Sequence, residues 1–373
     1  MLTYFWCTLV AVLFIAYGFI HALIFKGLRR LSYPVNAELQ SVSVIVAARN
    51  EEASIGRCLH ALVKQNYPKD MYEIIVVNDR STDATADIVM SMRAKFPFIR
   101  LITIDRLSAH LPPKKNALDE GIRNAKHDLL IFTDADSYPS GQWLREVVKA
   151  FTPTVGVVAG YSPFEWKATA SFGHRWGDLF LRYEELKNSI GAAAGVALNN
   201  AYMCTGRNFA YRRDVFEEVG GFNKIKQSVS GDDDLFIQLV QRETRWQIRY
   251  MTTPESVVVT EPPVTIDEFI NQRKRHFSAG KYYPGRMKLI FGAAHAFNAL
   301  VIFTIVLFPW YGLALFAIKL AIDWAVMREA TAMFGNRELL VKLVPLECMF
   351  VLYNLIIGPL GYLGQFDWKG TKR

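Results

Sequence analysis

Two aspartates near the middle of the chain have the residue type and the spacing that metal-assisted chemistry needs. They are Asp134 and Asp136, and they follow an apolar run at residues 129–132. A short apolar run between polar residues is typical of a strand buried on both faces of a parallel sheet. Alternation along an extended chain turns the two side chains the same way, and their oxygens suit Mg²⁺ or Mn²⁺ carrying a diphosphate. Taken alone, the pair also fits a solvated loop after a strand.

Polar residues also follow two earlier strand-like runs, at residues 42–47 and 73–77. Arg49 and Glu51 come after the first run, and Asp79 comes after the second. Further runs start near residues 98 and 129, with helical patterns between them. This alternation predicts βαβ units, an α/β fold and a mostly parallel sheet. Because the carboxyl ends of such strands meet in one crevice, we expect these polar side chains to line a single site.

The second half of the chain is less regular. Thr265 begins an amphipathic pattern that is dense in basic and aromatic residues and is typical of a helix beside a membrane. The remaining expectations are strands at 155–160, 204–211 and 246–251, helices at 168–190 and 232–241, and a loop at 192–200.

The composition indicates a membrane protein. Hydrophobic residues make up 51% of the chain and charged residues 21%, with mean hydropathy +0.12. Asp, Glu, Lys and Arg are absent from residues 1–25 and 289–318, and 343–364 contains only Glu347. A span takes about 20 apolar residues, so we predict spans at 1–26, 289–308, 311–327 and 343–364. The first segment lacks the basic start and the small-residue cleavage site of a signal peptide.

The distribution of charge predicts an orientation. Lys26, Arg29 and Arg30 follow the first apolar segment and predict that the next domain is cytoplasmic, in a multi-pass protein of the cell membrane. The net charge of +8 fits basic segments beside anionic headgroups, so nucleic acid is not an expected partner. Four spans would place the basic residues of the tail, 369–373, on the opposite side. Either one C-terminal segment lies in the membrane–water interface and does not cross, or the short basic tail is tolerated on the side opposite the α/β domain.

Lys319 and Asp323 are four residues apart within a predicted span. This spacing predicts an internal ion pair that lowers the cost of inserting both charges. The four cysteines show no metal or redox spacing.

Seven short motifs, in order over residues 42–276, resemble the family 2 glycosyltransferases, which have the GT-A nucleotide-sugar fold. The motifs are Val44–Glu51, Val76–Asp83, Lys114–Leu118, Thr133–Ser137, Gly206–Ala210, Gly231–Leu235 and Gln272–His276. The last one resembles the Gln-x-x-Arg-Trp signature of the membrane-embedded branch. The chain departs from the family pattern at two places, where Gly231 replaces a Glu and His276 replaces the Trp.

The resemblance implies a role for each matched position. The nucleotide-sugar would contact Arg49, Glu51, Asp79, Lys115 and Asp134, and the metal would be held by Asp134 and Asp136. Asp232 would be the general base, and Gln272 and Arg275 would close over the diphosphate and the acceptor. The acceptor pocket would include Gly206, Arg207, Asn208 and His276.

The resulting hypothesis is a membrane-bound inverting glycosyltransferase that uses Mg²⁺ or Mn²⁺, a nucleotide-sugar donor and a lipid or lipid-linked acceptor. Its expected organisation is a span at 1–26, a cytoplasmic GT-A domain at 38–264, an interfacial helix at 265–285, spans within 289–364 and a tail at 365–373. The alternatives are a processive polysaccharide synthase of the same family, a nucleotidyl or phosphoryl transferase, and an inactive homologue or membrane scaffold. No Gly-x-Gly-x-x-Gly follows the first predicted strand and no Gly-Lys-Ser/Thr occurs, which disfavours a Rossmann dinucleotide site and a P-loop.

Overall fold

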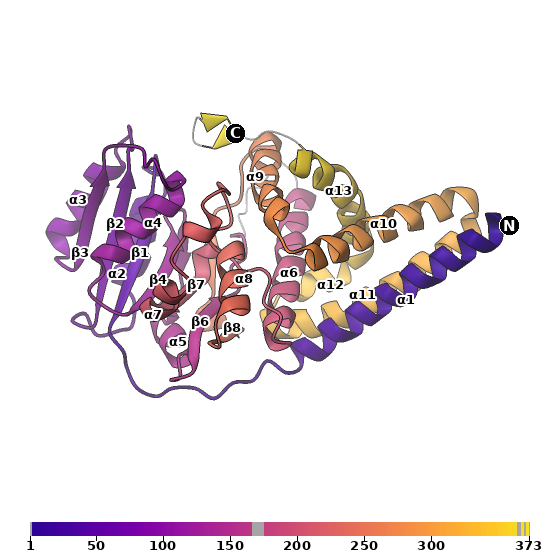
Figure 1. The fold of residues 1–373 in the computed structure, drawn as a ribbon, viewed down its shortest axis with the longest axis horizontal. Coiled ribbons are helices and arrows are strands. Elements are labelled where there is room, and N and C mark those ends of the chain that lie inside the picture. Colours follow the sequence, from indigo (N-terminus) through magenta and orange to yellow (C-terminus); the bar gives the residue numbers. More distant parts are fainter. Residues whose placement is uncertain (1, 166–174, 364–366, 369–370, 373) are drawn as a thin grey trace.

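An α/β domain carries a bundle of long helices on one side (Figure 1). The computed structural model describes residues 2–165, 175–363, 367–368 and 371–372. Within these ranges one seven-stranded sheet has the order β3-β2-β1-β4-β7-β6-β8. Its strands are β1 Val42–Ala48, β2 Tyr72–Asp79, β3 Ile99–Ile104, β4 Leu129–Asp134, β6 Val155–Gly160, β7 Phe209–Arg212 and β8 Gln247–Met251.

The strand directions confirm the predicted α/β class with a mostly parallel sheet. Strand β7 runs antiparallel to its neighbours β4 and β6, and the other pairs in the sheet are parallel. Strands β1 and β2 are apolar along most of their length because helices cover both faces of the sheet. A separate two-stranded sheet pairs β5, Ser137–Pro139, with β9, Val258–Thr260.

Two sets of helices enclose the sheet. Val44 and Val46 pack with α2 (Ile55–Val63), α3 (Thr85–Lys95) and α5 (Trp143–Ala150). Ile45 and Phe132 point to the opposite face, toward α4 (Pro113–Asn124), α6 (Arg175–Ala197) and α8 (Asp234–Glu243). The short helix α7, Arg213–Glu218, follows β7. The alternation along each strand therefore fills a core on both sides.

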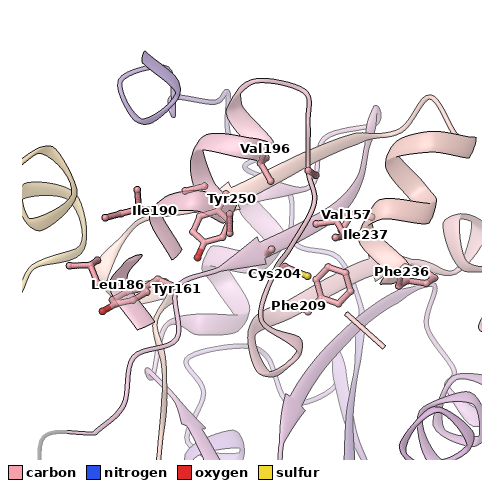
Figure 2. Packing of buried hydrophobic residues seen from close by; sticks show 14 of the residues in the cluster. Val157, Tyr161, Leu186, Ile190, Val196, Cys204, Phe209, Phe236, Ile237 and Tyr250 are labelled. Atoms are coloured by element: carbon pink, nitrogen blue, oxygen red, sulfur yellow. The ribbon is translucent and has the colours of Figure 1, made fainter. Parts of the chain in front are cut away.

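Helix α6 forms much of the second core. Figure 2 shows its residues Leu186, Ile190 and Val196 packed near Tyr161 and Tyr250. Tyr161 directly follows β6, and Tyr250 lies within β8. The expected helix at 168–190 is observed from Arg175 onward, and 168–174 lie outside the described residues. The loop expected at 192–200 is wrong as far as Ala197, because the helix continues there.

The small residues explain why α6 continues. A Cβ placed on Gly27 of α1 would come within 2.9 Å of the Ala194 carbonyl oxygen, so the two helix backbones are in close contact. Only small side chains allow two helices to approach so closely. The sequence of small residues therefore marks a packing surface and not a loop.

Four helices within the described residues are long and apolar enough to cross a membrane. They are α1 (Leu2–Leu28), α10 (Gly285–Leu307), α11 (Pro309–Phe334) and α13 (Leu343–Leu363), and the short α12 (Arg337–Val341) precedes the last one. This confirms the prediction of one such helix at the N-terminal end and three at the C-terminal end. Helix α11 is longer than predicted because Phe334 packs against the rings of Tyr161 and Tyr250 in the α/β domain.

The predicted ion pair between Lys319 and Asp323 is confirmed, with 2.7 Å between Nζ and Oδ2. The pair belongs to a larger buried network. Lys319 also binds Glu347 of α13, and Lys187 of α6 lies 3.4 Å from Asp323 and 3.3 Å from Glu347. Tyr17 of α1 donates a hydrogen bond of 2.5 Å to Asp323. The network therefore joins α1, α6, α11 and α13.

Helix α9, Ile266–Ala279, lies where the sequence predicted an amphipathic helix at 265–281. Thr265 and Glu268 form a capping box at its start, which satisfies backbone donors of the first turn. The helix packs along α13, where Phe269 lies 5.8 Å from Tyr353 between ring centroids. The last strands described are β10, Asp367–Trp368, and β11, Thr371–Lys372.

Candidate active site

The loops after β1 and β2 are tied together at the carboxyl edge of the sheet. Asn50 and Arg80 have φ angles of 53° and 55°, a left-handed conformation that non-glycine residues rarely adopt. Thr82 N–H donates to Asn50 Oδ1 at 2.8 Å, and Asn50 N–H donates to Ser81 Oγ at 3.0 Å. Such unfavourable backbone conformations persist where the surrounding contacts hold them. The two loops thus form one preorganised wall of the crevice.

This wall carries three of the predicted nucleotide-binding residues. Asp79 is buried and accepts hydrogen bonds from Arg80 Nε at 2.7 Å and Nη2 at 3.0 Å. Glu51 accepts a hydrogen bond of 3.1 Å from Ser54. Arg49 Nε is buried and has no hydrogen-bond partner in the described part of the chain. A buried donor without a partner is unusual in a folded protein, and an anionic ligand would satisfy it.

Asp134 is the last residue of β4, and Asp136 lies in the turn that follows the strand. Both are half-buried, whereas Ala135 between them is buried. Ser137 Oγ donates to Asp136 Oδ1 at 3.1 Å. Burial, together with the neighbouring carboxylates of Asp134 and Glu51, raises the pKa of Asp136 to about 6. Negative charge therefore gathers at this point of the crevice.

These carboxylates fit a divalent cation that is shared with a diphosphate. Among the described residues no group of three or more His, Cys, Asp or Glu side chains forms a protein-only metal site. Mg²⁺ is commonly held by one or two carboxylates together with substrate phosphates, so a complete protein cage is not required. The carboxylates of Asp134, Asp136 and Glu51 repel one another, and this repulsion adds to burial in raising the pKa of Asp136. A bound cation would reduce the repulsion.

Lys114 connects the metal-type carboxylates to the predicted base. Its Nζ lies 3.0 Å from Asp134 Oδ1 and 3.2 Å from Asp232 Oδ2. Burial alone would lower the pKa of Lys114, but the two carboxylates outweigh burial and raise it, so the ammonium stays charged. A small cavity adjoins this bridge and is lined by Lys114, Leu118, Phe132, Thr133, Asp134, Gly206, Phe209, Tyr211 and Asp232.

Lys115 points away from this cavity. Its ammonium is fully buried and donates to the backbone carbonyls of Ser228 at 2.7 Å and Ser230 at 2.8 Å. Burial lowers its pKa to about 8. Consecutive residues on a helix point in different directions, so only one of the two lysines reaches the crevice. The prediction that Lys115 contacts the nucleotide did not include Lys114, although the Lys-Lys pair was a signal that either residue could be used.

The three consecutive aspartates at 232–234 have different partners. Asp233 caps α8 and accepts hydrogen bonds of 2.8 Å from the backbone N–H groups of Asp234 and Gly206. Asp234 accepts from Cys204 N–H at 2.9 Å and from Tyr283 O–H at 2.7 Å. Asp232 instead faces Lys114 and the cavity. The geometry thus separates one carboxylate that faces the crevice from two that hold the backbone.

Charge also distinguishes these carboxylates. Burial alone would raise the pKa of Asp232, but Lys114 and Lys115 outweigh it and hold the pKa below its ordinary value. Burial and the neighbouring aspartate raise the pKa of Asp233 and of Asp234. Asp232 is therefore ionised while Lys114 is beside it, and loss of that ammonium would raise its pKa and its basicity.

The predicted acceptor motif is divided by the structure. Gly206 lines the cavity. Arg207 is buried, with its guanidinium donating to Ser162 Oγ at 2.7 Å and to Glu185 Oε1 at 2.9 Å. Asn208 is fully buried, and its amide nitrogen donates to the carbonyls of Tyr161 and Ser256. Asn208 thus fixes the strand end, and its side chain does not line the cavity.

Helix α9 brings the last motif to the same crevice. Arg275 and Lys114 are close enough for the charge of one to lower the pKa of the other. Arg275 Nη2 lies 3.2 Å from Nε2 of His276, whose ring is exposed. Gln272 accepts a hydrogen bond of 3.2 Å from Arg273.

Two adjacent glutamates of α6 hold these arginines, and the sequence analysis did not find them. Glu184 binds the buried guanidinium of Arg273, and Glu185 binds Arg207. Tyr353 of α13 donates to Glu184 at 3.1 Å. The available signal was the occurrence of two adjacent acidic residues in a helix that is rich in apolar residues, because buried charges are normally paired.

Residues 40–279 match the family described as Glycosyltransferase like family 2. The chain belongs to this family. The match covers the sheet, the crevice and α9, so the seven motifs of this family 2 domain lie within it. The Gln-x-x-Arg-Trp resemblance stays a prediction.

Two similar proteins illustrate the range of the family 2 likeness. A probable glycosyltransferase, YdaM, from Bacillus subtilis is 29% identical over 249 residues, covering 66% of this chain and 56% of the relative. The beta-monoglucosyldiacylglycerol synthase of Synechocystis sp. is 27% identical over 248 residues, covering 65% and 48%. The chain spans about half the length of the curated relatives it matches.

A solved structure extends the likeness to almost the whole chain. It is the mannosyltransferase PcManGT from Pyrobaculum calidifontis in complex with GDP-Man and Mn²⁺, at 22% identity and a TM-score of 0.57, covering 95% of this chain and 98% of that one. At this level of identity the likeness concerns the fold. It confirms the predicted GT-A fold class with its attached helices.

Proposed function

We propose that this chain is a membrane-bound inverting glycosyltransferase that moves a sugar from a nucleotide-sugar to a lipid or lipid-linked acceptor. The observation that carries the proposal is the Lys114 bridge, which links Asp134 of the charge cluster to Asp232 beside one cavity. Transfer of a sugar needs a place for a diphosphate and a base for a hydroxyl at adjacent points. The family 2 match supports this reaction class.

The donor would occupy the crevice above β1, β2 and β4. Glu51 and Asp79 provide acceptors for the nucleobase and ribose, and the unpartnered Arg49 Nε provides a donor for a phosphate or base oxygen. We assign the diphosphate contact to Lys114, since its ammonium is in the crevice, whereas Lys115 is committed to two backbone carbonyls. The earlier assignment of Lys115 to the nucleotide is replaced by this proposal.

Asp134 and Asp136 would hold Mg²⁺ or Mn²⁺ together with the diphosphate. When bound, the cation supplies charge neutralisation for the leaving diphosphate. The Mn²⁺ and GDP-Man bound to the mannosyltransferase PcManGT, which has a similar fold, support a divalent cation in this fold. Arg275 and Gln272 would contact the diphosphate and the acceptor from α9.

Asp232 would take the proton from the acceptor hydroxyl as that oxygen attacks the anomeric carbon. A positioned carboxylate of this kind contributes about 10²- to 10⁴-fold to the rate. The bond to the leaving diphosphate breaks on the opposite face, so the anomeric configuration inverts and no carboxylate nucleophile is required. If the arriving diphosphate draws Lys114 away, the pKa of Asp232 rises and the base becomes stronger when the donor is present.

The acceptor side of the site faces the membrane helices. Helix α9 carries Arg275 and His276 and packs on α13, one of the long apolar helices. His276 and Gly206 would contact the acceptor, while Arg207 and Asn208 hold the backbone beneath it. Polar side chains are few in the apolar helices, which disfavours a sugar-sized channel and a processive polymer synthase. The name of the Synechocystis relative supports a membrane lipid as acceptor.

We also propose that the protein is in the cell membrane with its α/β domain in the cytoplasm, because Lys26, Arg29 and Arg30 follow α1. This orientation gives the crevice access to cytoplasmic nucleotide-sugars and to lipid headgroups in the same leaflet.

The deciding experiment supplies the purified protein in lipid vesicles with radiolabelled UDP-, GDP- and dTDP-sugars and extracts the products with organic solvent. The proposal expects label in a small lipid-soluble product and inversion at the anomeric carbon. High-molecular-weight, water-soluble product made without added lipid would support a polymer synthase instead. Activity on a nucleoside triphosphate would support a nucleotidyl transferase, and no transfer with any donor would support a scaffold.

A further inference from the structure

We propose that α13, although long enough to span a membrane, does not cross it. The geometry points to a helix that lies across the α10–α11 hairpin, within the leaflet that faces the α/β domain, with one face against the acyl chains. The partner of this surface is therefore the hydrocarbon of a single leaflet. The inference concerns membrane placement and holds whatever the donor or acceptor is.

The turn of the hairpin provides a reference height. Helices α10 and α11 meet at Phe308, where a Cβ on Gly312 would come within 2.5 Å of the Ile305 backbone, so the two helices are in contact at the turn. At ~1.5 Å per residue, Lys319 on α11 lies about 17 Å from this turn and His295 on α10 about 20 Å from it. The two positions are therefore at nearly the same depth.

Helix α13 contacts the hairpin at both of these positions. Glu347, near its start, binds Lys319, and a Cβ on Gly358, near its end, would come within 2.5 Å of His295 Nε2. Glu347 and Gly358 are about 17 Å apart along α13, yet their contacts on the hairpin differ in depth by about 3 Å. A helix with that relation to its neighbours runs nearly at right angles to them.

The side of α13 that faces the protein touches the α/β domain along its whole length. Near its start, Lys187 of α6 lies 3.3 Å from Glu347, and in the middle Tyr353 donates to Glu184 at 3.1 Å. Near its end, a Cβ on Gly361 would come within 2.5 Å of the Phe277 Cβ on α9. Helices α6 and α9 belong to the catalytic half of the protein. A helix that crossed the bilayer would contact α6 and α9 only near one of its ends.

The opposite side of α13 is an exposed apolar stripe. Its members follow one another at steps of four residues, so they wind slowly around that side of the helix, and are Val344, Cys348, Leu352, Ile356 and Leu360. The exposed fractions of Leu352 and Ile356 are 54% and 57%. A continuous apolar stripe in water is rare in soluble proteins. The same kind of surface continues on α10 and α11, where Phe303 and Ile318 are exposed, so acyl chains are its occupant.

This placement has two consequences. Strands β10 and β11, which follow α13, then lie on the same side as the α/β domain, and the basic residue Lys372 in β11 agrees with that side. Helix α9, with Arg275 and His276, is separated from the acyl chains of that leaflet by the thickness of one helix, which is about 10 Å.

Spin labels measure the depth directly. One label is attached at Cys348 or at Leu352→Cys, Ile356→Cys or Leu360→Cys, in a chain whose other cysteines are replaced and which still elutes as a single species. The protein is placed in phosphatidylcholine–phosphatidylglycerol vesicles, and oxygen and a nickel chelate report the depth of each label. The proposal expects all four labels within about 4 Å of one depth. A crossing helix predicts steps of about 6 Å between successive positions, and that result would overturn the proposal.

Helix α11 supplies the matched control. Labels at Leu313→Cys, Ile318→Cys and Trp324→Cys lie on exposed positions of a helix that does cross, so they should differ in depth by about 7 to 9 Å per step. A second measurement uses Thr371→Cys with a membrane-impermeant maleimide in vesicles of known orientation. Labelling from the side that also labels Asp70→Cys in the α/β domain supports the proposal, and labelling from the other side contradicts it.

Discussion

At the level of single residues, the site depends on where one ammonium group is placed. Lys114 lies within 3.2 Å of two carboxylates that belong to different steps of the proposed reaction, Asp134 at the diphosphate and Asp232 at the acceptor. While it bridges them it neutralises both. A diphosphate competes for the same ammonium because charge-assisted contacts to phosphate are strong. Donor binding and the strength of the base are therefore coupled through this side chain.

Replacing the two lysines separately tests which of them contacts the donor. Lys114→Met should raise the KM for the nucleotide-sugar by about tenfold or more, since a charged hydrogen bond is worth about 1.5 to 3 kcal/mol. Lys115→Met should instead lower the Tm, because the carbonyls of Ser228 and Ser230 lose their buried partner. Steady-state kinetics and thermal unfolding of both variants give the answer. The opposite pattern would return the donor contact to Lys115.

The base is tested by comparing neighbouring aspartates. Asp232→Asn should lower kcat by about 10²- to 10⁴-fold while the dissociation constant of the nucleotide-sugar changes little, because the proton acceptor is lost and the shape is kept. Asp233→Asn should mainly lower stability, since that carboxylate caps α8 and holds Gly206. Titration calorimetry and turnover distinguish the two effects. If Asp233→Asn removes turnover and Asp232→Asn does not, the assignment of the base is off by one residue.

The cation site is tested at Asp136. Asp136→Asn should abolish turnover and weaken Mn²⁺ binding in the presence of the nucleoside diphosphate, because one of the two metal-type carboxylates is lost. Free Mn²⁺ measured by electron paramagnetic resonance gives the binding, and far-ultraviolet circular dichroism checks the fold. Asp70→Asn, an exposed carboxylate on the surface, serves as the control. Full activity of the parent protein in excess EDTA would contradict the cation site.

At the level of elements, α6 positions both basic residues on the acceptor side. Its adjacent residues Glu184 and Glu185 bind Arg273 of α9 and Arg207 beside β7. One turn away, Lys187 joins the buried network of the membrane helices. The same helix therefore contacts the acceptor side of the crevice and the membrane bundle, and its displacement would move α9.

The Glu184 contact is a testable part of this arrangement. Glu184→Met should destabilise the protein by about 3 to 5 kcal/mol, because Arg273 would be left as an unpaired buried charge. It should also raise the KM for the acceptor while the KM for the donor stays constant. Combining it with Arg273→Met should restore most of the stability, since neither charge is then unpaired. Thermal unfolding and kinetics at varied acceptor concentration measure both effects, and equal changes in both KM values would argue against positioning.

At the level of the whole molecule, the buried network fastens the membrane helices to the catalytic half. Lys319 and Asp323 are both 1% exposed, and their partners come from α1, α6 and α13. Charges in such surroundings are costly unless they are paired. Every charged side chain of the network has all its partners only when α1, α6, α11 and α13 are packed together. The network therefore favours the assembled arrangement of these four helices.

Removing one charge from this network tests its role in assembly. Lys319→Met should destabilise the protein by about 3 to 5 kcal/mol, because two buried carboxylates lose one of the two ammonium groups that they share. The neighbouring Ile318→Ala is the matched control, since that side chain is 50% exposed and should change the stability little. Thermal unfolding in detergent compares the two variants. Equal shifts in Tm would mean that the network does not hold the helices together.

The sequence by itself determined the features that depend on local pattern. Apolar runs located the strands of the sheet, and long uncharged segments located the four long helices. The motif order identified the family, since each motif is contiguous in the chain. These features depend on the periodicity of a strand or helix and on hydrophobicity, which can be read from neighbouring residues alone.

Only the tertiary structure decided which partners the charged side chains have. The packing of Leu118 and Ile122 against the sheet turns Lys114 to the crevice and Lys115 into the protein, and neither lysine reveals this by its type. The close contact of α1 extends α6 through its small residues, and contacts from α6, α9 and the hairpin give α13 its crosswise direction. Such contacts join residues far apart in the chain, so a local pattern carries no record of them.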